Sequence, residues 1–128
     1  MTAALLLAPL FKFGIIGDVQ PADIPDGPNF ARTKPRRYRQ SLACLREASS
    51  AWNEVAFCVQ LGDLLDSKAA PRRWETLAAA RGAMGQHDWH VATGNHDLAC
   101  FDRDELRAIA GRDLYYDWTP APGFRCCL

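Results

Sequence analysis

Three short apolar segments of this 128-residue chain each end in glycine followed by side chains that carry oxygen or nitrogen donors. Apolar runs of this length, bounded by turn formers, are typical of buried strands in parallel sheets. Open α/β sheets bind ligands beyond the carboxyl ends of their strands, so the three endings predict one site at one edge of a sheet. The segments and their endings are Phe13–Gly17 with Asp18 and Gln20, Val55–Leu61 with Gly62 and Asp63, and His90–Thr93 with Gly94, Asn95 and His96.

Helical patterns separate these predicted strands. Apolar residues recur at helical spacing from about Pro35 to Trp52, and again from about Pro71 to Met84, where Gly85 closes the helix. Asp102, with Glu105 three residues later, forms a capping box for a short third helix that stops at Gly111. Strands alternating with helices predict an α/β fold, a βαβαβ parallel sheet with right-handed crossovers.

The last residues predict a further pair of strands. Leu114–Trp118 and Phe124–Leu128 are joined by the turn formers of residues 120–123. The second of these strands ends at its apolar residues, with no turn after it. We therefore expect residues 1–128 to be one incomplete domain, the front part of a larger one.

Composition limits the classes of partner. Lys plus Arg and Asp plus Glu both number 15, so nothing in the net charge of zero favours a nucleic acid or an anionic membrane. Five cysteines without a CxxC pair predict free thiols and a cytoplasmic location rather than a disulfide framework. No apolar run reaches the roughly 20 residues of a membrane span. We also expect the protein to be a monomer.

The donor side chains at the strand ends suit a metal centre. The oxygens of Asp18, Gln20, Asp63 and Asn95 are hard ligands of the kind that Mg²⁺ and Mn²⁺ prefer. A central carboxylate such as Asp63 can bridge two ions held ~3.5–4 Å apart, the arrangement that promotes phosphoryl transfer. The imidazole of His96 could then donate a proton to a leaving oxygen or stabilise charge on phosphorus.

Two features after the first strand each have two interpretations: Phe30 in the following loop, and a run of five basic residues within residues 32–39. Phe30 packs on the core or stacks on a substrate, and the first is favoured. The basic run is either the solvated start of a helix, which we prefer, or a phosphate-facing patch. A helix dipole does not explain cations at a helix N-terminus, which keeps the second interpretation open. The run comprises Arg32, Lys34, Arg36, Arg37 and Arg39.

The three endings also resemble a known family. Their order and spacing are similar to the D-x-H (or D-x-Q), G-D-x-x-D and G-N-H-[DE] motifs of the calcineurin-like metallophosphoesterases. Gln20 in place of histidine narrows the resemblance to members that hydrolyse ADP-ribose and CDP-alcohols with manganese. The motifs here are Asp18-Val19-Gln20, Gly62-Asp63-Leu64-Leu65-Asp66 and Gly94-Asn95-His96-Asp97.

The resemblance implies the N-terminal part of an α/β sandwich and a role for each residue. Asp18 and Gln20 would hold a first ion, Asp63 would bridge, and Asn95 would hold a second. His96 would be the catalytic imidazole, which Asp66 would orient. The ions would be Mn²⁺, with Mg²⁺ as the alternative, and the substrates small nucleoside diphosphate derivatives cleaved at the pyrophosphate bond.

The chain departs from the family in one respect. The family completes its metal shells with a later histidine and a Gly-His-x-His motif, and no histidine follows His96 here. His87 and His90 come before or at the start of the third strand, so we expect them on the far side of the sheet from the site. The alternatives are therefore a catalytically inactive truncated isoform or fragment, and another metallophosphoesterase, a phosphodiesterase or phosphatase.

Overall fold

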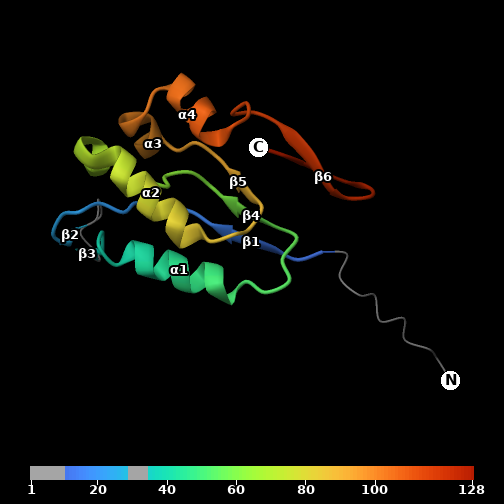
Figure 1. The fold of residues 1–128 in the computed structure, drawn as a ribbon, viewed down its shortest axis with the longest axis horizontal. Helices are drawn as coiled ribbons and strands as arrows, with labels where there is room; N and C mark the ends of the chain where they lie inside the picture. The colour runs from blue at the N-terminus through green and yellow to red at the C-terminus, as the bar shows by residue number, and fades with distance from the viewer. Residues whose placement is uncertain (1–10, 29–34) are drawn as a thin grey trace.

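A parallel sheet forms the centre of the molecule (Figure 1). The computed structural model describes residues 11–28 and 35–128. The sheet contains β1 (Phe13–Ile16), β4 (Phe57–Gln60) and β5 (Trp89–Val91), in the order β1-β4-β5. Both pairs are parallel, with Gly14 opposite Cys58 and Val59 opposite His90. The predicted α/β fold is confirmed, and each strand is shorter than its apolar run.

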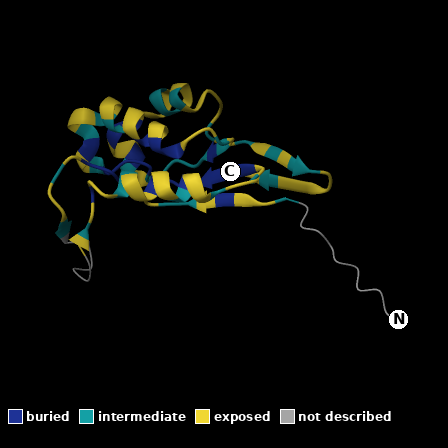
Figure 2. Ribbon diagram, turned by 60° about the horizontal axis from the view of Figure 1, so that its bottom comes forward, coloured by how far each residue is buried: buried dark blue, intermediate teal, exposed yellow. Residues whose placement is uncertain are grey.

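Two helices cover one face of this sheet (Figure 1). They are α1 (Ser41–Ala51) and α2 (Arg73–Met84), which pack against each other. A Cβ at Gly14 would overlap the ring of Trp52, so the lack of a side chain there lets β1 approach the end of α1. Figure 2 shows the buried residues gathered between sheet and helices. Leu45, Leu65, Leu77 and Ala80 belong to this core.

The predicted first helix begins later than its apolar pattern. Residues Pro35–Arg36 form β3, which pairs with β2 (Gly27–Pro28) in an antiparallel ladder. Tyr38 is buried but lies in a turn, where its carbonyl accepts a bond from the Ser41 hydroxyl at the start of α1. The spacing of Tyr38 from the apolar residues of α1 fits a helix, but Tyr38 precedes the helix. The loop predicted after the first strand likewise contains a short strand, β2.

Three short helical segments lie at the end of the sheet where the predicted site is. They are the 3-10 helix η1 (Ser67–Arg72), α3 (Asn95–Cys100) and α4 (Arg103–Ala110). The predicted capping box of Asp102 and Glu105 is present, and α4 ends at Gly111 with φ 67°. Pro71 lies in η1, before α2 rather than in its first turn. The sequence analysis did not predict α3, whose six residues are too few to show a helical period.

The predicted C-terminal pair of strands is present as a hairpin, β6 (Asp117–Ala121) and β7 (Phe124–Cys127). The bounds of the first strand were wrong, because β6 begins at Asp117 rather than Leu114 and continues through residues 120–121, which were predicted as turn. The Trp118 ring of the hairpin stacks on His90 at 3.7 Å, and the Trp118 and Phe57 rings meet edge to face at 5.6 Å. The hairpin therefore contacts the sheet face that α1 and α2 leave uncovered. Phe13 and Ile15 of β1 are about half exposed. No helix among the described residues is long and apolar enough to cross a membrane.

Candidate active site

The loops after β1 and β4 are joined through their backbones. The Asp18 N–H donates to the Gly62 carbonyl at 3.2 Å, and the Gln20 N–H donates to the Asp63 carbonyl at 3.2 Å. Three of these residues have left-handed backbones, with φ of 53° at Asp18, 46° at Gln20 and 56° at Asp63. Positive φ in residues other than glycine is uncommon and concentrates at functional sites. The backbone thus marks the same positions as the sequence motifs.

The side chains of these loops converge on Asp63. Gln20 Nε2 donates to Asp63 Oδ2 at 3.0 Å and to Asp18 Oδ1 at 3.3 Å. The other carboxylate oxygen of Asp63 accepts the backbone N–H of His96 at 2.9 Å, which links it to the loop after β5. The structure therefore brings the three strand ends together, with the predicted bridging carboxylate at their centre.

Glycine at position 94 makes this convergence possible. A Cβ added there would overlap the Asp63 carboxylate and its backbone nitrogen. The loop is further tied by Asp97, whose buried carboxylate accepts the N–H of Gly94 at 3.0 Å and that of Leu65 at 3.0 Å. Burial raises the pKa of Asp97, and the bonds from backbone N–H groups act in the opposite direction. Asp97 is thus a structural tie between two loops.

His96 is held by a backbone group. The Ser67 N–H donates to His96 Nδ1 at 3.1 Å. Since Nδ1 accepts this bond, the neutral ring carries its proton on Nε2, an assignment that follows from the bonding pattern. Asp66 Oδ2 lies 3.6 Å from Nδ1, beyond hydrogen-bond distance. Ser67 therefore fixes the ring in this structure, and the orienting role predicted for Asp66 stays a prediction.

Asp66 is almost fully buried, with 1% of its side chain exposed. One oxygen caps η1 by accepting the Lys68 N–H at 2.9 Å, and the other accepts Arg36 Nη1 at 3.0 Å. The preferred interpretation of the basic run, a solvated helix start, is therefore wrong for Arg36, because its guanidinium pairs with a buried carboxylate. Arg39 fits that interpretation, since it pairs with the exposed Asp23.

The donor set fits part of a metal centre. The carboxylates of Asp18 and Asp63 both lie within 3.3 Å of the amide nitrogen of Gln20, so they are close enough to face a shared cation. Asp18, Gln20, Asp63 and Asn95 offer oxygen donors suited to Mn²⁺ or Mg²⁺. Within residues 11–28 and 35–128 there is no group of three His, Cys, Asp or Glu side chains that could hold an ion. These residues could hold ions only with further ligands.

Sequence reasoning missed several contributors to the site. The basic run includes Arg36, but the sequence does not indicate that its guanidinium pairs with Asp66. Asp97 belongs to the third motif, but its residue type indicates no role there, and Ser67 gives no signal because it acts through its backbone. Phe30, the predicted substrate-stacking candidate, lies outside the described residues. His90 lies on β5 and contacts the hairpin, as expected for a residue away from the site.

Comparison with known proteins finds likenesses that extend over most of this chain. A family model described as calcineurin-like phosphoesterase matches residues 11–125. A solved structure, a dimetal phosphatase from Danio rerio, superposes with a TM-score of 0.85 at 36% identity, covering 94% of this chain and 44% of that one.

Curated relatives give a more specific likeness. Proteins named manganese-dependent ADP-ribose/CDP-alcohol diphosphatase from Danio rerio, Arabidopsis thaliana and Homo sapiens are each 38% identical to this chain. The matches cover 94%, 91% and 93% of the chain, and 44%, 41% and 43% of the respective relatives. The chain thus spans less than half the length of the curated relatives that it matches.

Proposed function

Because this chain belongs to the calcineurin-like phosphoesterase family, we propose that it forms the N-terminal part of a dinuclear diphosphatase site. The substrates are nucleoside diphosphate derivatives, ADP-ribose and CDP-alcohols. The observation that carries this proposal is the convergence of three strand-end loops on Asp63. The names of the relatives support the substrate class, and Gln20 agrees with it.

We assign one role to each donor residue. Asp18 and Gln20 would hold one Mn²⁺, Asn95 would hold the other, and Asp63 would be shared between them, with Mg²⁺ as an alternative. When bound, the ions supply positive charge at the phosphoryl group and lower the pKa of a water molecule. Water attacks one phosphorus and the P–O–P bond breaks. ADP-ribose thus yields AMP and ribose 5-phosphate, and CDP-choline yields CMP and phosphocholine.

His96 serves as a hydrogen-bond donor in this reaction. With Nδ1 accepting the Ser67 N–H, the proton on Nε2 is the one available to a phosphoryl or leaving oxygen. Donors fixed before the reaction stabilise charge without reorganising, which is the usual source of electrostatic catalysis. Asp66 makes no hydrogen bond to the ring, and its Oδ2 lies 3.6 Å from Nδ1, so any orienting effect on His96 would come from its charge.

Binding without turnover is the second candidate. It is favoured by the partial donor set of the described residues. A phosphodiesterase or phosphatase of the same family is the third candidate. Gln20 argues against it, because glutamine in place of histidine resembles the members that act on ADP-ribose and CDP-alcohols.

A chimera separates these candidates. Residues 11–125 of this chain would replace the matching region of the Danio rerio relative, and both chimera and isolated chain would be assayed with Mn²⁺. We expect the chimera to hydrolyse ADP-ribose and CDP-choline. We expect the isolated chain to show less than about a thousandth of that rate, a barrier difference of ~4 kcal/mol.

Two results would contradict the proposal. One is a chimera that cleaves p-nitrophenyl phosphate but neither diphosphate. The other is a chimera, checked for folding by circular dichroism, that shows no Mn²⁺ binding by electron paramagnetic resonance. Turnover by the isolated chain equal to that of the chimera would show that its own donors suffice.

A further inference from the structure

We propose that Gln60 is a positioning residue of the metal centre, because its buried side-chain amide fixes the peptide between Gly62 and Asp63. The proposal rests on the proposed function, and it names a residue that acts on the donors Asp18 and Asp63 without binding an ion itself. Three observations support it: complete burial, a pair of hydrogen bonds to Gly62, and a carbonyl oxygen shared with the first loop.

Gln60 is the last residue of β4, and it is completely buried, with 0% of its surface exposed. The other residues of the strand are Phe57, Cys58 and Val59. Glutamine is seldom buried unless its amide is hydrogen-bonded, because an unpaired polar group in the core is costly. The contacts of the amide therefore indicate what this residue does.

Both backbone polar groups of Gly62 bond to this amide. Gln60 Nε2 donates to the Gly62 carbonyl at 2.6 Å, and the Gly62 N–H donates to Gln60 Oε1 at 2.9 Å. Because an N–H only donates and a carbonyl only accepts, this pattern fixes which end of the amide faces each group. Gly62 is buried just beyond β4 and has a φ of 100°, so these groups need protein partners where the chain turns. Glutamine offers a donor and an acceptor on one planar group, which neither an ionised carboxylate nor an apolar side chain provides.

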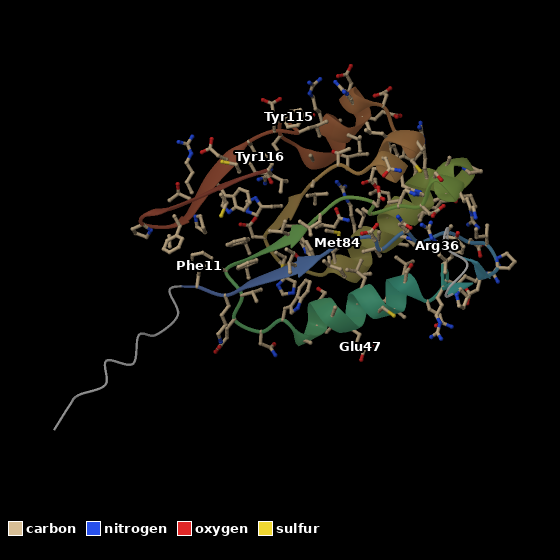
Figure 3. All side chains as sticks on the ribbon, turned by 180° about the vertical axis from the view of Figure 1, so that it is seen from behind. Phe11, Arg36, Glu47, Met84, Tyr115 and Tyr116 are labelled. Carbon is tan, nitrogen blue, oxygen red and sulfur yellow. The ribbon has the colours of Figure 1, made fainter. Side chains whose placement is uncertain are left out.

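The Gly62 carbonyl also holds the loop after β1. It accepts the Asp18 N–H at 3.2 Å, so one oxygen receives bonds from Gln60 and from Asp18, which use its two lone pairs. Figure 3 shows β1 and β4 side by side, both pointing toward the end of the molecule where Arg36 is labelled. The same planar peptide group continues into Asp63, so its orientation sets where that residue begins. Gln60 therefore acts on both donor residues through one peptide.

Loss of this amide would release the peptide from one of its two partners. Without it, the Gly62 carbonyl keeps only the bond from Asp18, which at 3.2 Å is the longer of the two. The peptide could then rotate, and the carboxylates of Asp18 and Asp63 would no longer be held in one arrangement before an ion binds. Removing a residue that orients a metal ligand typically lowers metal affinity by about 10- to 100-fold.

The test compares two substitutions in the chimera described above. Gln60→Met keeps an unbranched side chain of similar volume and removes both bonds to Gly62. Val59→Ala is the matched control, because Val59 is the preceding residue of β4, is buried and has no polar group in its side chain. Electron paramagnetic resonance measures Mn²⁺ affinity, and urea midpoints record stability. We expect both variants to unfold at lower urea, and Gln60→Met alone to lose Mn²⁺ affinity, by at least about tenfold.

A second readout needs no metal and uses the present chain. Amide hydrogen exchange, followed by nuclear magnetic resonance, reports how firmly the Asp18 N–H is bonded to the Gly62 carbonyl. We expect exchange at Asp18 to be at least about tenfold faster in Gln60→Met and to change less than about twofold in Val59→Ala. If Gln60→Met fails to fold, Gln60→Asn replaces it, because its amide is one methylene too short to reach both groups of Gly62.

The outcomes are distinct. A folded Gln60 variant that keeps the wild-type Mn²⁺ affinity, or the wild-type exchange rate at Asp18, overturns the proposal. A loss of affinity no larger than that of Val59→Ala overturns it as well, since reduced stability would then account for the effect. A wild-type chimera that binds no Mn²⁺ overturns the proposed function instead, and faster exchange at Asp18 in the Gln60 variant would still show that Gln60 couples the two loops.

Discussion

Two histidines lie close together in the sequence, and the structure holds them in opposite ways. His96 is at the loop end of the sheet, where the Ser67 N–H fixes its Nδ1 and its own N–H fixes Asp63. His90 is under the hairpin, stacked on Trp118 at 3.7 Å, with Nδ1 2.9 Å from the Tyr116 oxygen. His90 Nε2 is buried and has no hydrogen-bond partner among the described residues.

The difference shows what prepares a side chain for chemistry. Hydrogen bonds from backbone groups set the tautomer of His96 and leave a fifth of its side chain exposed. Aromatic packing instead removes His90 from solvent, and that burial lowers its pKa while Asp88 acts against the shift. One imidazole has a fixed tautomer and a partly exposed ring, and the other is buried under the hairpin. Four substitutions test this contrast.

The largest effect is expected from Asp63→Asn. The amide keeps the shape and tolerates the left-handed backbone, but it loses the charge that faces Gln20 and the proposed ions. We expect Mn²⁺ affinity to fall more than about 100-fold, beyond the effect of removing an outer-shell partner of a ligand. Calorimetric titration of the chimera with Mn²⁺ measures this, and Gln20→His should lose less. An equal or larger loss in Gln20→His would contradict a shared role for Asp63.

The next effect is steric and comes from Gly94→Ala. The added methyl group would overlap Asp63, so we expect a loss of about 2–3 kcal/mol in the free energy of unfolding. Gly82→Ala is the matched control, because nothing lies within 4 Å of its added Cβ and it is within α2. That control should gain about 0.5–1 kcal/mol. Urea denaturation compares the two, and similar changes would show that the loops can separate freely.

A smaller effect is expected from Ser67→Pro. Proline removes the N–H that bonds His96 Nδ1, yet it suits the first position of η1, after the extended Asp66. Ser67→Ala keeps the N–H and serves as the control. We expect about a tenfold fall in kcat with KM unchanged, the scale of one hydrogen bond of ~1 kcal/mol. Measured in the chimera, unchanged kcat in the proline variant would remove Ser67 from the positioning of His96.

The smallest effect concerns His90. Its folded pKa lies below the ordinary value of 6.5, so the unfolded state binds the proton more readily. Stability from this residue is present above that value and is lost as the pH falls below it. His90→Phe keeps an aromatic ring without a titrating group and should flatten this dependence. Urea midpoints at pH 7.5 and 5.5 provide the measurement, and an equally steep decline in the variant would exclude His90 as its cause.

The sequence predicted the sheet and the meeting of its strand ends because both depend on local patterns. Apolar runs ending in Gly and Asp predict strand ends, and parallel strands bring those ends to one edge. Contacts across the fold were not predictable in this way. The pair between Arg36 and Asp66 joins residues 30 positions apart, and it requires the register of β3, which the helical pattern hid.

Residues that act through their backbones were also not predictable, because the sequence analysis relied on the chemistry of side chains. Ser67 acts through its N–H, and Gly94 acts by lacking a side chain. α3 was missed because its six residues fill less than two turns. These features depend on how the three loops fit together, which no single stretch of sequence records.

The backbone bonds between the first two loops have a consequence for protein engineering. Asp18 and Gln20 obtain their left-handed conformations while bonded to the carbonyls of Gly62 and Asp63. A designer who transplanted the first loop alone into another scaffold would move the donor atoms without the contacts that hold them. The smallest portable unit is the two loops with the spacing of adjacent parallel strands, plus the glycine at position 94. A host sheet that lacks this adjacency is expected to accept the residues but not their geometry.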